Sequence, residues 1–90
     1  MLFLNITQNY NKKMLQLKDK RLIKFGEHVH ALREKLGLSV NDVAARSYLS
    51  KSDLVSIEQG KKNFGFTTLL ELCKGLGVKP QDLLNLDMEL

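Results

Sequence analysis

The segment from Ser39 to Gly60 constrains the fold more than any other part of the chain, because it predicts two short helices joined by a short turn. Ser39 can cap the first helix, with Asp42 at the third position after it. Ser50 can cap the second in the same way, with Asp53. In such a box the serine oxygen accepts from a first-turn N–H that has no intrahelical partner. Gly60 can adopt the left-handed conformation that ends a helix. Helices this short need tertiary packing, so further helices must cover them.

The residues around this unit resemble those of the phage-repressor family of DNA-binding proteins (Cro and lambda-repressor-like, also called the xenobiotic-response-element type). The resemblance spans roughly residues 20 to 86 and rests on the order and spacing of the whole set. It implies an all-α fold, a compact five-helix lambda-repressor-like domain with a helix-turn-helix. The matching positions are Arg33, Gly37, Leu38, Ser39, Val43, Ala44, Leu49, Ser50, Ile57, Glu58, Gly60, Lys61, Leu69, Leu72, Leu76, Gly77, Val78, Leu83 and Leu84.

The first helix is predicted to begin near Asp19 or Lys20 and to run to about Leu36, where Gly37 stops it. Its apolar residues recur at steps of three and four and so form one stripe. They are Leu22, Phe25, Val29, Leu32 and Leu36.

The fourth helix is expected to begin between Gly65 and Thr68, with Thr68 and Glu71 as a T-x-x-E capping box. Its many apolar residues, Phe66 among them, predict the central buried helix. Gly75 and Gly77 are expected to loosen its end. Pro80 suits the first position of a fifth helix.

At 90 residues the chain has room for one small domain. We expect an extra N-terminal arm over residues 1–18, disordered unless it packs locally or across a dimer, a DNA-binding domain over 19–86 and a tail over 87–90. We expect neither a membrane-spanning helix nor a secretory signal, because the chain has no apolar run long enough for the one and the apolar stretch at residues 1–4 is too short for the other. Its single cysteine, Cys73, is expected to be a buried, inert thiol. These features favour a cytoplasmic protein.

The formal net charge of +4 suits a polyanionic partner. Basic residues concentrate between positions 12 and 35, whereas the end of the chain from Asp82 carries only acidic charges. This asymmetry fits nucleic-acid binding and equally fits ordinary solvated helix faces.

The resemblance implies that the helix from Ser50 to about Gln59 enters the major groove of double-stranded DNA. Lys51 can donate to guanine, Ser52 and Ser56 can donate or accept, and Val55 can meet a thymine methyl group. Lys51 could instead bind a phosphate. Phosphate contacts are expected from the start of the preceding helix, from the turn and from the loop after the recognition helix. The candidates are Ser39, Asn41, Arg46, Tyr48, Lys61, Lys62 and Asn63.

The resemblance also implies a structural ion pair between Arg33 and Glu58, which would tie the first helix to the recognition helix. The chain departs from the family at two positions, since Val40 replaces a glutamine and Tyr48 replaces the turn glycine. Tyr48 would be strained if the turn needs a positive φ there; otherwise the turn differs.

His28 and His30 are two apart, which is not the i, i+4 spacing of helical metal ligands, so we expect solvent-facing histidines and no metal site. No residue pattern indicates catalysis or a cofactor, so we expect a protein that is not an enzyme.

One recognition helix buries little surface, so we expect a homodimer on a near-palindromic operator, with Leu86 and Met88 as its interface. The regulator could be a repressor, a restriction–modification controller or an antitoxin-like autoregulator. The alternative is a protein-interaction module on the same fold. Asp53 and Glu58 beside a single Lys51 favour that alternative, because they leave the recognition helix poorly basic.

Overall fold

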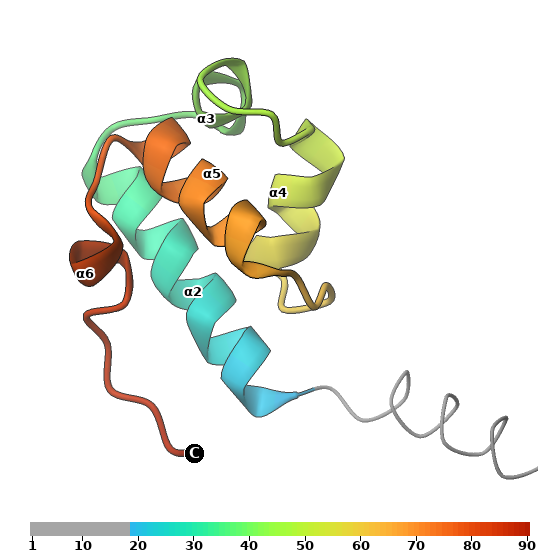
Figure 1. Cartoon of the computed structure of the whole chain (residues 1–90), viewed down its shortest axis with the longest axis vertical. Coiled ribbons are helices and arrows are strands. Elements are labelled where there is room, and N and C mark those ends of the chain that lie inside the picture. Colours follow the sequence, from blue (N-terminus) through green and yellow to red (C-terminus); the bar gives the residue numbers. More distant parts are fainter. Residues whose placement is uncertain (1–18) are drawn as a thin grey trace, which may run out of the picture.

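The computed structural model describes residues 19–90, so the arm predicted over residues 1–18 lies outside the described part. Residues 19–90 form five helices joined by turns and loops, and this part of the chain contains no strand (Figure 1). This confirms the predicted all-α, five-helix fold. The helices are α2 (Lys20–Lys35), α3 (Val40–Ala45), α4 (Lys51–Glu58), α5 (Phe66–Leu76) and α6 (Pro80–Leu83).

Local capping sets most of these boundaries. Asp19 caps α2 by accepting from the Arg21 N–H at 2.9 Å. At α3 the box is reciprocal, because Ser39 Oγ accepts from the Asp42 N–H and the Asp42 carboxylate accepts from the Ser39 N–H. Ser50 Oγ accepts from the N–H three residues on and caps α4. The predicted starts of α2, α3 and α4 are therefore confirmed.

The helix ends also follow the predicted stops. Gly37 and Gly60 have φ values of 72° and 70°, in the left-handed region. Pro80 occupies the first position of α6 as predicted, where its missing N–H costs nothing.

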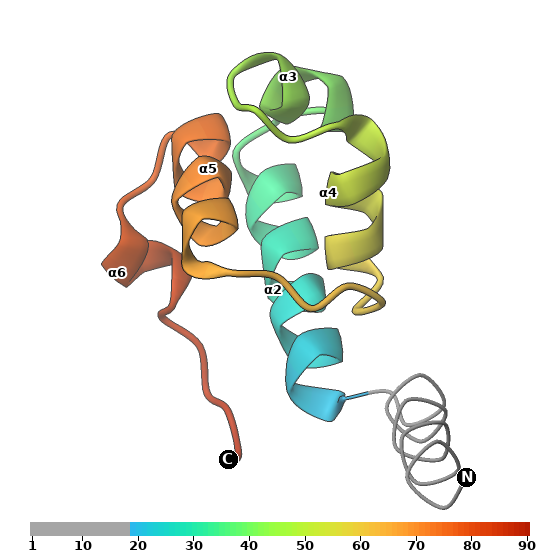
Figure 2. The ribbon, with the colours of Figure 1, turned by 45° about the vertical axis from the view of Figure 1, so that its right-hand side comes forward.

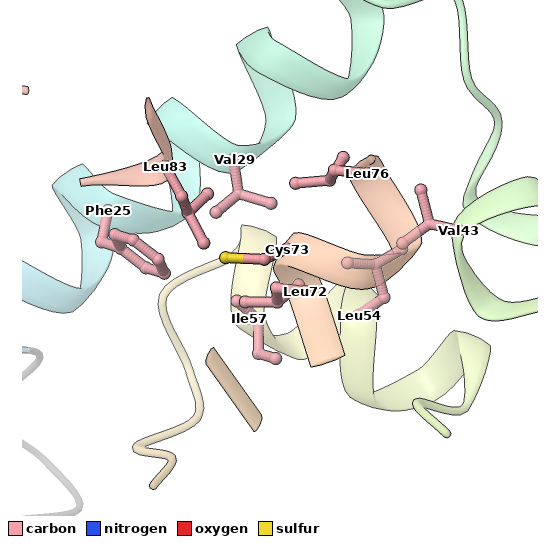
Figure 3. Close-up of a cluster of buried hydrophobic side chains, with 9 residues drawn as sticks. All are labelled: Phe25, Val29, Val43, Leu54, Ile57, Leu72, Cys73, Leu76 and Leu83. Atoms are coloured by element: carbon pink, nitrogen blue, oxygen red, sulfur yellow. The ribbon is translucent and has the colours of Figure 1, made fainter. Parts of the chain in front are cut away.

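All five helices contribute to one hydrophobic core (Figure 3). Val29 of α2, Val43 of α3, Leu54 of α4, Leu72 of α5 and Leu83 of α6 are completely buried. The other members are Phe25, Ile57, Cys73 and Leu76. Every helix thus buries apolar side chains in the same core, and this packing stabilises the short helices α3 and α4.

Cys73 is 5% exposed, and burial raises the pKa of its thiol. It lies in the core as predicted, and its burial disfavours the reactive thiolate form.

Two glycines let the helix-turn-helix approach its supports closely. A Cβ on Gly26 of α2 would lie 2.4 Å from the Ile57 carbonyl oxygen of α4. A Cβ on Gly75 of α5 would lie 2.7 Å from the Val43 carbonyl oxygen of α3. Gly75 is therefore a close packing contact near the end of α5, and Gly77 ends the helix in the left-handed conformation.

Three predictions about apolar and capping residues are wrong. Leu36 follows the last residue of α2 and is 44% exposed, because the helix ends before the stripe reaches it. Phe66 begins α5 and is 69% exposed. The start of α5 falls within the predicted range, but Gly65 is its N-cap, so Thr68 lies inside the helix and Glu71 has another partner.

Leu86 and Met88 are half-buried and pack on the core of their own protomer. Part of the surface predicted for a dimer interface is therefore used within the chain. Among residues 19–90, no helix has the length and apolarity to cross a membrane.

Candidate nucleic-acid interface

Helices α3 and α4 form the predicted helix-turn-helix and lie at one side of the molecule, α3 across the end of α5 and α4 beside α2 (Figure 2). Ser47 organises the turn, since its Oγ donates to the Val43 carbonyl at 2.9 Å and accepts from the Leu49 N–H at 3.2 Å. The Glu71 carboxylate of α5 accepts from the Tyr48 N–H at 2.8 Å. The turn is thus tied to the helix beneath it.

Tyr48 fits this turn without backbone strain. Within residues 19–90 no residue other than glycine has a positive φ, so the turn differs from one that needs glycine. The side chain is 90% exposed, and the Lys74 ammonium lies 5.3 Å from the centroid of its ring. Tyr48 is therefore exposed at the surface of the turn, and its contact with a phosphate stays a prediction.

The predicted base-reading residues lie on the outer side of α4. Lys51 and Ser52 are exposed at its N-terminal end, Val55 is 39% exposed and Ser56 is half-buried. Leu54 and Ile57 point into the core from the opposite side. No carboxylate of residues 19–90 lies within ion-pair distance of Lys51. The start of α4 therefore offers one cation and hydroxyl groups to a partner.

Glu58, at the other end of α4, is bound by two side chains of α2. Arg33 Nε donates to Glu58 Oε2 at 2.7 Å, and its Nη2 donates to Oε1 at 2.9 Å. Arg33 Nη1 also donates to the Leu38 carbonyl at 2.9 Å. The Arg33 and Glu58 side chains are 11% and 8% exposed, so this is the bidentate pair that the resemblance implies, largely shielded from water.

His30 joins the Arg33–Glu58 pair, and the sequence did not predict this contact. Its Nδ1 lies 2.7 Å from Glu58 Oε1 and its Nε2 lies 2.7 Å from Glu34 Oε1. The hydrogen bond with Glu58 raises the pKa of His30. Burial raises the pKa of Glu58, but the bonds from Arg33 and His30 outweigh burial and leave that pKa lowered. Glu58 is therefore held as a neutralised carboxylate.

The prediction of solvent-facing histidines is confirmed for His30, whose side chain is 48% exposed, and is wrong for His28. His30 bridges two carboxylates, and His28 is half-buried with a buried Nε2 that has no hydrogen-bond partner. No group of His, Cys, Asp and Glu in residues 19–90 could hold a metal ion.

The other carboxylate of α4 also has a cation. Lys62, in the loop after α4, places its Nζ 2.5 Å from Asp53 Oδ1. This hydrogen bond is the main cause of the lowered pKa of Asp53. Lys62 was predicted to contact a phosphate, and in the free protein its ammonium has this partner instead.

The remaining phosphate candidates differ in how free they are. Asn41 and Arg46 of the α3 region and Lys61 and Asn63 of the loop are exposed. Ser39 is exposed too, but the Asp42 carboxylate already occupies the start of α3, where a phosphate was predicted. The structure therefore favours Asn41 and Arg46 over Ser39 as contacts from this helix.

Comparison with known proteins agrees with this geometry. A family model described as a helix-turn-helix domain matches residues 24–86. An uncharacterised helix-turn-helix-type transcriptional regulator of Sinorhizobium fredii, y4dJ, is 40% identical over 58 residues, which cover 64% of this chain and 75% of that protein.

Similar solved structures include restriction–modification controller proteins. The controller C.AhdI of Aeromonas hydrophila is 32% identical with a TM-score of 0.68, over 72% of this chain and 98% of the controller. The C.Esp1396I tetramer, solved in complex with its natural 35-base-pair operator, is 25% identical with a TM-score of 0.68, over 72% of this chain and 86% of that one.

Proposed function

The chain belongs to the helix-turn-helix domain family, and on that premise we propose that this DNA-binding transcriptional regulator reads its operator by inserting α4 into the major groove as a homodimer. Within the family we place it in the phage-repressor (Cro and lambda-repressor-like) type and in the repressor or controller class. Its similarity to C.AhdI and C.Esp1396I supports the controller class.

The observation that carries the proposal is the charge distribution on α4. Counted from sequence alone, the helix has Asp53 and Glu58 against Lys51, which disfavours DNA. In the folded chain, Glu58 is bound by Arg33 and His30 from α2. Asp53 is bound by a lysine of the following loop. Lys51 is left as the uncompensated charge at the end that meets the bases, so the objection behind the interaction-module alternative is removed.

Each residue on the outer side of α4 can then contact a different base edge of the operator. Lys51 donates to O6 and N7 of guanine, and Ser52 and Ser56 donate or accept at neighbouring base edges. Val55 contacts a thymine methyl group. Contacts to the phosphate backbone position the helix and carry no sequence information themselves. Asn41, Arg46, Tyr48, Lys61 and Asn63 are exposed around α4 and supply these contacts.

A dimer follows from the small surface of one α4, because two copies can read half-sites ~34 Å apart along DNA. The tetramer of C.Esp1396I on its operator supports an oligomeric reader. Phe66 and Leu70 are one turn apart on α5 and remain 69% and 39% exposed. Because Leu86 and Met88 are partly used within the protomer, we extend the predicted interface to this face of α5.

We also propose that the protein acts by binding DNA and not by catalysis, and that it acts in the cytoplasm.

The test is selection of duplexes from a random pool at moderate salt, followed by binding of the selected duplex. Wild-type protein is expected to enrich a near-palindrome. A variant with Lys51→Ala and Ser52→Ala is expected to lose preference for that duplex by about 100-fold, since each good base contact contributes about 1–3 kcal/mol of discrimination. Its circular-dichroism spectrum should stay helical. Unchanged preference in the folded variant would show that α4 is not the reading helix.

A further inference from the structure

The loop that follows α4 is held in place on both sides of Lys62. Gly60 takes the left-handed conformation, and the Lys61 N–H donates to the Ser56 carbonyl at 2.9 Å. The Phe64 ring then packs on Phe25 of α2, with ring centroids 5.4 Å apart. Lys62 lies between these anchors, so the backbone presents its side chain to α4.

Lys62 uses that position to reach a residue nine positions earlier, Asp53, with 2.5 Å between Nζ and Oδ1. Asp53 is the third residue of α4 and immediately follows Ser52, one of the proposed base-reading residues. The side chains of Lys62 and Asp53 are 41% and 39% exposed. A pair this exposed contributes little to folding stability, so stability does not explain it.

We propose that Lys62 is a positioning residue for DNA reading, which neutralises Asp53 so that the start of α4 can approach the phosphates, and that it does not itself contact a phosphate in the complex. This inference rests on the proposed function and names a specific part of its interface. The sequence had instead predicted that Lys62 and its neighbour Lys61 both bind phosphates of the DNA backbone.

The physical reason is that the reading end of α4 must lie between two rows of phosphates. An unpaired carboxylate on the third residue of the helix would repel them across a distance shorter than the Debye length, where salt screens poorly. Paired with Lys62, Asp53 presents no net charge. The pair then contributes no counterion release, whereas a lysine bound to a phosphate contributes about 0.9 to the slope of log affinity against log salt.

The experiment measures affinity and salt slope for wild-type protein and for Lys62→Gln, Asp53→Asn and the double variant, on the selected duplex and on an unrelated duplex of equal length. Lys62→Gln exposes the carboxylate and is expected to weaken binding about fivefold. The double variant keeps a neutral amide pair and is expected to bind within about twofold of wild-type, with the wild-type salt slope. Lys61→Gln is the matched control, because losing its exposed ammonium from both protomers of the dimer should reduce the magnitude of the salt slope by about 1.8.

Opposite outcomes separate the possibilities. A double variant whose salt slope falls in magnitude by about 1.8, as in Lys61→Gln, would overturn the proposal, because Lys62 would then be an ordinary phosphate contact in each protomer. An unchanged affinity in Lys62→Gln would also overturn it. If wild-type protein binds both duplexes equally, sequence-specific reading fails, while recovery of affinity and slope in the double variant still supports the role of Lys62. If it binds neither duplex, both proposals fail.

Discussion

Replacing Arg33 with methionine is the sharpest test of how the recognition helix is held. The substitution keeps much of the aliphatic stem and removes the guanidinium. The guanidinium donates two hydrogen bonds to Glu58, of 2.7 and 2.9 Å, and one to the Leu38 carbonyl. Without it, the Glu58 carboxylate stays at a site where only 8% of its side chain is exposed. Its remaining partner is His30.

The magnitude follows from this geometry. Breaking a fully buried ion pair by removing one partner costs about 3–5 kcal/mol. His30 still bonds to Glu58 and the site is not completely dry, so we expect the free energy of unfolding to fall by about 2–3 kcal/mol. For a domain of this size, each kcal/mol corresponds to about 4–8 °C, so the melting temperature should fall by about 10–20 °C.

Urea unfolding followed by circular dichroism measures this loss directly. Lys35→Met is the matched control, because Lys35 lies in the same last turn of α2 and is exposed. It should change the free energy of unfolding by about 0.5 kcal/mol or less. The double variant Arg33→Met with Glu58→Met leaves no uncompensated charge and should be more stable than Arg33→Met alone. A loss below about 0.5 kcal/mol in Arg33→Met, or additive losses in the double variant, would refute the reasoning.

Two further predictions concern the same pair of helices. Gly26→Ala places a Cβ 2.4 Å from the Ile57 carbonyl oxygen, so α2 and α4 must separate, and we expect a loss of about 3 kcal/mol by urea unfolding. In Gly65→Ala the Cβ meets nothing within 4 Å, but alanine caps α5 less well than glycine, so we expect a loss of about 0.5–1 kcal/mol. Equal losses in the two variants would contradict this packing argument. The pKa of His30 is raised by Glu58 above its ordinary value of 6.5, so the folded protein binds this proton more tightly than the unfolded one. The stability due to this proton is complete below about pH 6.5 and is lost as pH rises through the raised pKa. Melting temperature should fall across that window in wild-type protein and fall less in His30→Gln; identical pH profiles would show that His30 is not coupled to folding.

Local sequence patterns were sufficient for most of the helix boundaries. A serine with an aspartate three residues on, or a glycine after a helical run, acts through backbone groups within one turn of itself. Ser39, Ser50, Gly37 and Gly60 therefore behave as their patterns predict. The pattern of Thr68 and Glu71 failed because a glycine outside it begins the helix, and because Glu71 is needed by the turn at Tyr48.

The candidate site was predictable only in part. The exposed side of α4 follows from the positions of its apolar residues, and the Arg33–Glu58 pair came from the family resemblance. The partners of Asp53, Tyr48 and Glu58 did not follow from any local pattern. Asp53 binds a residue nine positions away, the Tyr48 N–H one 23 positions away, and Glu58 binds His30 across 28 positions.

The sequence by itself therefore determined which segments become helices, where they are capped and which faces they bury, because these depend on contacts within a turn or two and on apolar spacing. Only the tertiary structure decided how closely the helices pack at Gly26 and Gly75, and which cations neutralise Asp53 and Glu58. Sequence alone counts those carboxylates as a negative recognition helix. Folding brings cations from other elements to them, because electrostatic partners are chosen by distance in space and not by separation along the chain.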